Sequence, residues 1–331
     1  TGHGFKIIKE KEGVTVDYDK TVEQLYTYVT EKWNKKANIK LTATTTVSKP
    51  KYTTEDCEKV SNEPMGSYTT EFSVGSSYAN RNLNIQNGAK LINGAVVYPG
   101  EQYSCNENLY PWTEDNGWHP AGTYVDGGVQ DSLGGGICQV SSTLYNALLR
   151  AEIKVVKRFP HSMAVGYVPL SADAALAGDY KDLVFENDTD APIYVQGIYN
   201  SGGSITFNIY GHDTRKAGHS VKYESKTIKT TPVKTQTKKD SSKPVGYSEV
   251  ESSGHVGYVA ELWKITYENG KQVSKELIHT STYAMSPTIV VKGTKKASTT
   301  TKKDDSDKDH KKSSEETTKK STSSKKSKKS E

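Results

Sequence analysis

A run of three glycines, Gly134 to Gly136, stands two residues before Cys138 and limits the possible structures of this chain more than any other stretch. Behind the cysteine, apolar residues recur at the spacing of one helical face. They are Val140, Leu144, Leu148 and Ala151, with Ala147 beside them. Short hydroxyl side chains fill the first turn, where they can cap backbone N–H groups. The sequence therefore predicts an amphipathic helix with Cys138 at its N-terminus.

A cysteine in that position has the chemistry of a nucleophile. The N–H groups and the dipole of a helix N-terminus favour negative charge, and so favour the thiolate over the thiol. Backbone N–H groups of Gly136, Ile137 and Cys138 could stabilise an oxyanion, and the glycines would let a substrate approach the backbone closely. The alternative is that Cys138 is a small residue packed against a neighbouring strand.

Composition sets the outer limits of the fold. A chain of 331 residues with 33% apolar content has room for about two domains plus polar appendages. It contains no apolar run of about 18 residues, so no transmembrane helix is predicted. The chain starts at Thr1 without a methionine, which indicates a processed product or fragment whose targeting segment is missing.

The net charge of +5 comes from the C-terminal tail. From Lys295 onward there are thirteen lysines against seven acidic residues, so the rest of the chain is nearly neutral. A nucleic-acid-binding face is therefore not indicated. The tail, residues 296–331, is Lys-, Ser- and Thr-rich and is predicted to be disordered. It is either a solvated linker or a segment that contacts an anionic wall polymer.

The three cysteines are too few and too widely spaced for a zinc ribbon or a disulfide framework. Cys57 and Cys105 could pair in an oxidising compartment, which would leave Cys138 free. The histidines show none of the short spacings typical of zinc-binding helices, so we expect no metal and no cofactor.

Periodicity and turn signals divide the chain into four parts. Residues 1–62 indicate a small α+β piece with too little core to be complete. Residues 65–213 indicate a β-rich α+β domain around the Cys138 helix, in which Val165 to Val168 is one expected strand. Residues 219–295 indicate an elongated all-β module, with Asn269-Gly270 as a hairpin turn. The predicted fold class is therefore α+β, followed by an all-β module and the tail.

The central segment resembles the VanW family, whose name comes from an accessory gene of glycopeptide-resistance clusters. The most specific match is the stretch from Gly134 to Asn146. Other matching residues occur in the expected order: Arg81 with Asn84, Pro99-Gly100-Glu101, Arg158 with His161-Ser162, Asp173-Ala174, and Asp182-Leu183 before Asn187.

Residues from about Val221 to Lys295 resemble a G-five module of wall-associated proteins, and residues 1–62 resemble part of a peptidoglycan-binding domain. These resemblances imply an extracytoplasmic, cell-wall-associated protein whose partners are the stem peptides and glycan strands of peptidoglycan. They also imply L,D-transpeptidation, in which a cysteine forms direct cross-links between stem peptides.

For that reaction, Cys138 is the expected nucleophile and His161, 23 residues downstream, the expected base, with His119 as the rival. Asp173 or Asp182 could orient the imidazole. Gly136 and Ile137 are the candidate oxyanion donors. The expected substrate-binding residues are Arg81, Trp118, His119, Gln139, Ser141, Arg158 and Asp173.

Several of these residues have a structural alternative. Arg81 and Arg158 could bind a stem-peptide carboxylate or hold a buried carboxylate of the protein itself. Ser141 could contact substrate or cap the helix. For the whole protein, the alternative to an enzyme is a non-catalytic wall-binding protein of the glycopeptide-resistance type, in which the Cys138 loop is only a structural turn.

Overall fold

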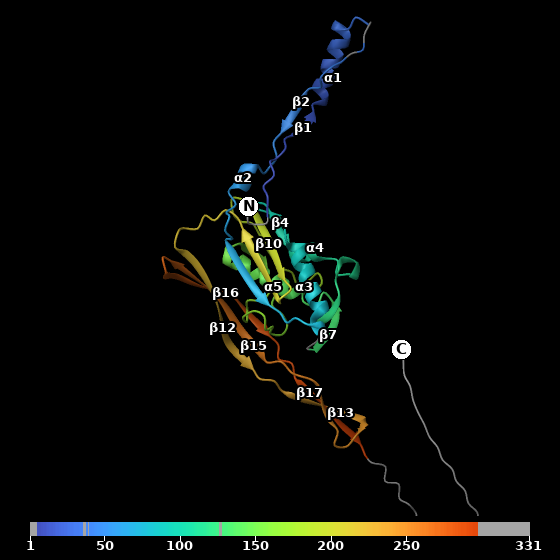
Figure 1. The fold of residues 1–331 in the computed structure, drawn as a ribbon, viewed down its shortest axis with the longest axis vertical. Helices are drawn as coiled ribbons and strands as arrows, with labels where there is room; N and C mark the ends of the chain where they lie inside the picture. Colours follow the sequence, from blue (N-terminus) through green and yellow to red (C-terminus); the bar gives the residue numbers. More distant parts are fainter. Residues whose placement is uncertain (1–4, 36–37, 39, 126–127, 297–331) are drawn as a thin grey trace, which may run out of the picture.

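The computed structural model describes residues 5–35, 38, 40–125 and 128–296. A central α+β body carries an elongated extension at each end (Figure 1). One extension holds the N-terminal elements and the other holds the last six strands, β12 to β17. The predicted tail, apart from residue 296, lies outside the described residues. The fold class predicted from the sequence, α+β with an all-β C-terminal part, is confirmed.

The central body is built on a four-stranded antiparallel sheet in the order β3-β11-β10-β4. Its strands are β3 (Gly66–Glu71), β4 (Ala95–Val97), β10 (Ile193–Asn200) and β11 (Ser204–Tyr210). Helix α5 (Ile137–Ala151) packs on β3 and β11, and helix α3 (Ala79–Ile92) packs on β10. Leu144, Leu148, Ile193 and Phe207 are fully buried where the helices meet the sheet. Burial of such side chains supplies most of the driving force for folding.

Helix α5 begins directly after a glycine turn and ends where Glu152 takes up a left-handed conformation, φ +58°. Cys138 is its second residue, as the sequence predicts. The helix is buried on nearly all sides, and not only along the apolar stripe. Its polar residues are tolerated there because they hydrogen-bond to surrounding backbone.

Smaller elements complete the central body. Strands β5 (Gln102–Ser104), β8 (Lys154–Lys157) and β9 (Val184–Glu186) form a three-stranded sheet with β9 in the middle. Strands β6 (Pro120–Val125) and β7 (Gly128–Leu133) form a hairpin that leads into the glycine turn. Three short helices lie between the strands: η2 (Ser76–Tyr78), α4 (Cys105–Leu109) and η3 (Glu114–Asn116). The strand expected at Val165 to Val168 is absent, because this segment is a loop.

The C-terminal part consists of two three-stranded sheets in series, ordered β12-β15-β16 and β13-β17-β14. The first contains β12 (His219–Thr231), β15 (Gly257–Glu268) and β16 (Lys271–Tyr283), and Asn269-Gly270 forms the predicted hairpin turn between the last two. The second contains β13 (Thr235–Pro244), β14 (Ser248–Ser252) and β17 (Thr288–Lys295). The first sheet lies beside the central body and the second extends away from it (Figure 1).

The N-terminal part is thin and mostly solvent-exposed. Strands β1 (Gly13–Val16) and β2 (Thr45–Ser48) pair antiparallel, and helix α1 (Tyr18–Thr27) and the π-helix η1 (Tyr28–Lys32) lie between them in the sequence. Helix α1 buries no residue. Helix α2 (Thr54–Glu58) follows, and a capping box at Thr53 and Asp56 fixes its start. All three cysteines are free, so Cys57 and Cys105 are not paired.

Candidate active site

The glycine turn before α5 depends on glycine for two separate reasons. Gly134 and Gly136 have φ of +83° and +109°, a conformation that side chains disfavour. Gly135 lies so close to β6 that an added Cβ would stand 2.5 Å from the carbonyl oxygen of Ala121. The N–H of Ile137 donates to the Gly134 carbonyl at 2.9 Å and closes the turn. The glycines therefore allow the protein to pack closely against itself, and they fix where Cys138 lies.

The Cys138 side chain is half-buried and is held by a segment distant in sequence. The backbone N–H of Leu176 donates to Cys138 Sγ at 3.4 Å, and Sγ also lies 3.4 Å from the Leu176 carbonyl oxygen. A backbone N–H directed at sulfur stabilises a thiolate. Leu176 is a candidate site residue that no sequence pattern indicates.

His161 and Asp173 form a tight pair next to Cys138. The Nδ1 atom of His161 lies 2.6 Å from Asp173 Oδ2, and the backbone N–H of His161 donates to the same oxygen at 2.7 Å. This pairing sets the imidazole so that its other nitrogen, Nε2, faces the Tyr167 hydroxyl at 3.3 Å. The positive charge of His161 also acts on the Cys138 side chain and lowers the pKa of its thiol. The three side chains lie in the order of a Cys–His–Asp triad, an arrangement in which the third group can orient a base.

The electrostatics favour a charged cysteine–histidine pair. Burial raises the pKa of the Cys138 thiol, but the hydrogen bond and positive charge of His161 outweigh it, and the net pKa is lowered. Burial likewise lowers the pKa of His161, but hydrogen bonds to Asp173 and Cys138 raise it to about 9. Both shifts favour the thiolate–imidazolium form over the neutral pair, and the thiolate is the reactive form of a cysteine nucleophile.

Arg158 binds both the carboxylate and the backbone of Asp173. Its Nη2 donates to Asp173 Oδ1 at 2.6 Å and its Nε donates to the Asp173 carbonyl. The guanidinium side chain is only 7% exposed. In this structure Arg158 holds a buried carboxylate of the protein, which is the structural alternative stated for it above. Asp182 lies elsewhere, where it accepts from the Ser104 hydroxyl and the Asn106 N–H at the start of α4.

Two of the expected substrate contacts on α5 are buried inside the domain. Ser141 is fully buried and donates to the Ala174 carbonyl at 2.6 Å, one residue beyond Asp173. Gln139 is also buried; its amide donates to Thr70 and to the Glu71 carbonyl, and its oxygen accepts from Arg81. These side chains join the start of α5 to β3 and to the segment that follows Asp173, and they do not face an open groove.

Arg81 does line a groove, whereas Trp118 does not. A groove of about 450 Å³ runs beside the glycine turn, between η2 and the β6–β7 hairpin, and Arg81, Tyr78 and Asp131 are among its walls. Trp118 is fully buried and donates from its indole to the Leu109 carbonyl. His119 is half-buried, and its backbone, with that of Gly135, is bonded to the side chain of Asn84. The imidazole that pairs with a carboxylate beside Cys138 is that of His161.

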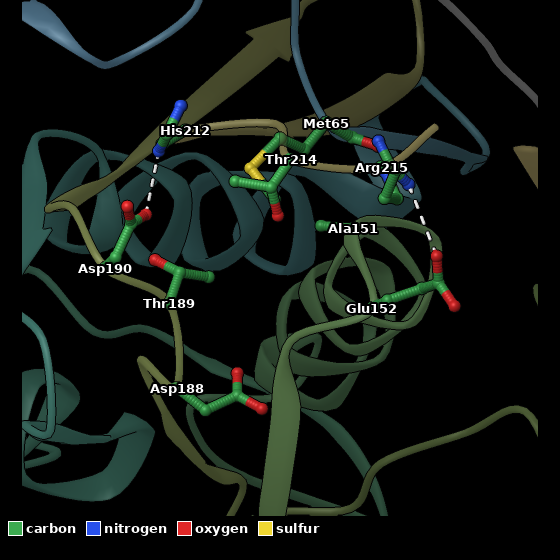
Figure 2. A pocket seen from close by; sticks show the side chains of 9 residues that line it. All are labelled: Met65, Ala151, Glu152, Asp188, Thr189, Asp190, His212, Thr214 and Arg215. Carbon is green, nitrogen blue, oxygen red and sulfur yellow. Dashed lines mark hydrogen bonds and ion pairs between the residues drawn. The ribbon is translucent and has the colours of Figure 1, made fainter. Parts of the chain in front are cut away.

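A second cavity, of about 280 Å³, lies at the other end of α5 (Figure 2). His212 pairs with Asp190 at 2.8 Å and Arg215 approaches Glu152 at 3.7 Å across its walls. Glu152 follows the last residue of α5, so the cavity is about 20 Å from Cys138 along the helix. It is therefore separate from the triad. Within the described part of the chain, no group of three or more His, Cys, Asp or Glu side chains is arranged to hold a metal ion.

The fold and the triad define a cysteine-centred α+β domain joined to an all-β extension. Residues 80–210 match the family of VanW-like proteins, and residues 222–295 match the G5 domain. The chain therefore contains a VanW-like domain followed by a G5 domain, and both resemblances seen in the sequence are confirmed. The resemblance of residues 1–62 to a peptidoglycan-binding domain stays a prediction.

Two curated proteins are similar to this chain. The uncharacterized protein YoaR of Bacillus subtilis is 37% identical over 164 residues, which cover 50% of this chain and 53% of YoaR. The vancomycin B-type resistance protein VanW of Enterococcus faecalis is 28% identical over 116 residues, which cover 34% of this chain and 42% of that protein. The chain thus spans about half the length of the curated relatives it matches.

A solved structure of an IgA1 protease G5 domain is also similar. It is 31% identical to this chain, the match covers 25% of this chain and 96% of the solved one, and the TM-score is 0.19.

Among the described helices, none has the length and apolar character needed to cross a membrane.

Proposed function

We propose that this protein is a cysteine acyltransferase of the cell wall, an L,D-transpeptidase that joins peptidoglycan stem peptides. The observation that carries the proposal is the His161–Asp173 pair beside Cys138, in which Nδ1 lies 2.6 Å from Oδ2 and the charge of His161 lowers the pKa of the Cys138 thiol. The match to VanW-like proteins supports a cell-wall and glycopeptide-resistance setting, and the G5 domain supports association with the wall. On this basis we also infer an extracytoplasmic location.

The first half of the reaction forms an acyl-enzyme. The Cys138 thiolate attacks the carbonyl carbon of a donor stem-peptide amide and gives a tetrahedral oxyanion. Collapse of this intermediate breaks the C–N bond, and the His161 imidazolium gives its proton to the departing amine. The products are a thioester on Cys138, a released amine and a neutral imidazole.

The second half transfers the acyl group. An amine of the acceptor stem peptide attacks the thioester carbonyl, and the neutral His161 takes the proton that this amine loses. The C–S bond then breaks, so that a new amide forms and the thiolate–imidazolium pair is restored. Asp173 stays ionised throughout and stabilises the charged imidazole.

The helix N-terminus is the source of oxyanion stabilisation in this proposal. The N–H groups of Gly136 and Cys138 lie where α5 begins, and its dipole favours negative charge there. Ile137 is a weaker candidate, because its N–H already donates to Gly134. The groove beside the glycine turn, with Arg81 in its wall, is the proposed channel for one of the stem peptides.

The first prediction concerns Cys138. The Cys138→Ala variant should form no cross-linked muropeptide, a loss of at least about 1,000-fold, because the covalent route is removed. The assay is mass spectrometry of purified muropeptides after incubation with the protein. Cys57→Ala is the matched control, since Cys57 is half-buried on α2, outside the candidate site, and should keep full activity.

Retention of cross-linking by Cys138→Ala would refute the enzymatic proposal. If the wild-type protein forms no cross-links while both it and Cys138→Ala bind isolated sacculi equally well, the chain is instead a wall-binding protein. The presence of the G5 domain is the observation that favours that second function.

A further inference from the structure

Strand β16 of the G5 domain presents one face to the triad. Successive side chains of a strand point to opposite sides, so His279, Ser281 and Tyr283 share a face. Ser281 and Tyr283 are buried, whereas the intervening Thr280 and Thr282 are exposed. The buried face lies against the VanW-like domain. The N–H of Ala284, the first residue after β16, donates at 2.7 Å to the carbonyl of Ser162, which follows His161.

Tyr283 makes direct contact with the triad. Its hydroxyl donates to Asp173 Oδ1, the oxygen that also accepts from Arg158. The same hydroxyl accepts from the backbone N–H of Ser171 at 2.7 Å. Burial and the charge of Asp173 raise the pKa of the Tyr283 phenol, so it stays protonated and remains a donor.

Two further contacts from β16 hold the segment that carries Asp173. Ser281 Oγ accepts from Arg158 Nη1 at 2.8 Å and pairs with Ser171 Oγ at 2.8 Å. Ser171 has φ +68°, a conformation that residues with a side chain rarely adopt without support from their surroundings. His279 lies on the same face, between Tyr145 and Ser171. The turn before Asp173 is thus supported by the G5 domain.

We propose that the G5 domain completes the catalytic centre: the Tyr283 hydroxyl positions Asp173, and through it His161, so that Cys138 is fully activated only when β16 is docked. Tyr283 is a positioning residue, because it contacts neither the thiol nor the substrate. The inference rests on the proposed role of the triad, but it concerns the state of the thiol and not the identity of the acyl acceptor.

The test is the pH profile of Cys138 alkylation by iodoacetamide in the full chain. Peptide mapping by mass spectrometry follows Cys138 separately from Cys57 and Cys105. The variant is Tyr283→Phe, which removes the hydroxyl and keeps the ring. The matched control is Tyr223→Phe, because Tyr223 also crosses between the domains, where its hydroxyl donates to the Leu149 carbonyl at 2.8 Å, away from the triad.

In Tyr283→Phe, Asp173 Oδ1 keeps Arg158 but loses the Tyr283 donor, so the carboxylate is held less firmly in its alignment with Nδ1. The imidazolium is then less favoured, and the thiol holds its proton to higher pH. We expect alkylation of Cys138 at pH 6.5 to slow by about tenfold, the usual weight of one hydrogen bond to a charged group, and the midpoint of the profile to move to higher pH. Tyr223→Phe should follow the wild-type curve.

The inference is overturned if the Tyr283→Phe curve coincides with the wild-type curve, or if both variants shift equally, since docking alone would then matter. If Tyr283→Phe does not fold, Ser281→Ala replaces it, and an unchanged curve for that variant also overturns the inference. The readout needs no peptidoglycan. A protein that lacks transpeptidation but has a Tyr283-dependent thiol would contradict the proposed function alone.

Discussion

Asp173 determines the charge balance of the candidate site. Its buried carboxylate accepts hydrogen bonds from the backbone and ring of His161, from Arg158 and from Tyr283. Burial raises the pKa of this carboxyl, but the His161 hydrogen bond and the Arg158 charge outweigh it and hold the pKa well below its usual range. Asp173 therefore stays ionised at any physiological pH and keeps His161 protonated.

The rate of acyl transfer should depend on pH in a way that follows from these shifts. On the acidic side the rate rises as Cys138 loses its proton, at a pH below that of free cysteine. On the alkaline side it falls near pH 9, as His161 loses the proton it must give to the leaving amine. Groups facing His161 are Asp173, Cys138 and Tyr167.

In the Asp173→Asn variant the negative charge that raises the His161 pKa is removed. The alkaline limb should then move down by more than one pH unit, toward about 6.5, the value of an unperturbed histidine. Initial rates of muropeptide cross-linking between pH 5 and 10 at constant ionic strength measure both limbs. An alkaline limb that stays near pH 9 in Asp173→Asn would assign it to another group.

Candidate site residues that belong to a local sequence pattern could be predicted. Residues that only the fold brings to the site could not. The glycine run pointed to Cys138, and His161 was expected as the base because it follows a helix and a strand that could bring it back to Cys138. Asp173 and Asp182 could not be separated in the sequence, because only the folded chain shows that Asp182 caps α4. Leu176, Tyr167 and Tyr283 carry no local signal. They contribute a backbone N–H or a hydroxyl that the fold brings from a distance of up to 110 residues.

The turn before α5 is the element in which the site tolerates the least change of geometry. Gly135 faces the backbone of Ala121, which cannot move without displacing the β6–β7 hairpin. Gly135→Ala should therefore lower the free energy of unfolding by about 1–3 kcal/mol, the usual cost of overpacking. Gly166→Ala is the control, because a Cβ there meets open space without a left-handed backbone. Urea unfolding measures both, and equal effects would mean that Gly135 is not tightly packed.

Elements were predictable where periodicity and packing agree. The apolar stripe of α5 predicted its helix, but not that Ser142 and Asn146 are also buried, where they bond to the backbone at Ala174 and Ala172. The expected strand at Val165 to Val168 was wrong. Its alternating pattern is typical of a strand, but Tyr167 turns toward His161 and Val168 into the core, so the segment is a wall of the site.

At the scale of the whole molecule, the two domains meet over more than the triad. Glu152, just beyond α5, lies 2.7 Å from His219 Nε2 at the start of β12 and 2.6 Å from Lys264 Nζ on β15. These three side chains are 15–22% exposed, so the pairs are only partly screened by solvent. The sequence predicted an all-β module with low apolar content. Nothing in that pattern indicates that polar pairs attach the module to the neighbouring domain.

Glu152→Gln should weaken this attachment, because the amide keeps the shape of the carboxylate but removes the negative charge next to Lys264 and leaves His219 with Glu268 as its acidic partner. We expect the free energy of docking to fall by about 1–2 kcal/mol. Calorimetry should show the G5 transition separating from, or preceding, that of the VanW-like domain. Glu251→Gln is the control, because Glu251 pairs with Lys238 at an exposed position within the G5 domain and should change little. Equal effects of the two variants would show that Glu152 does not join the domains.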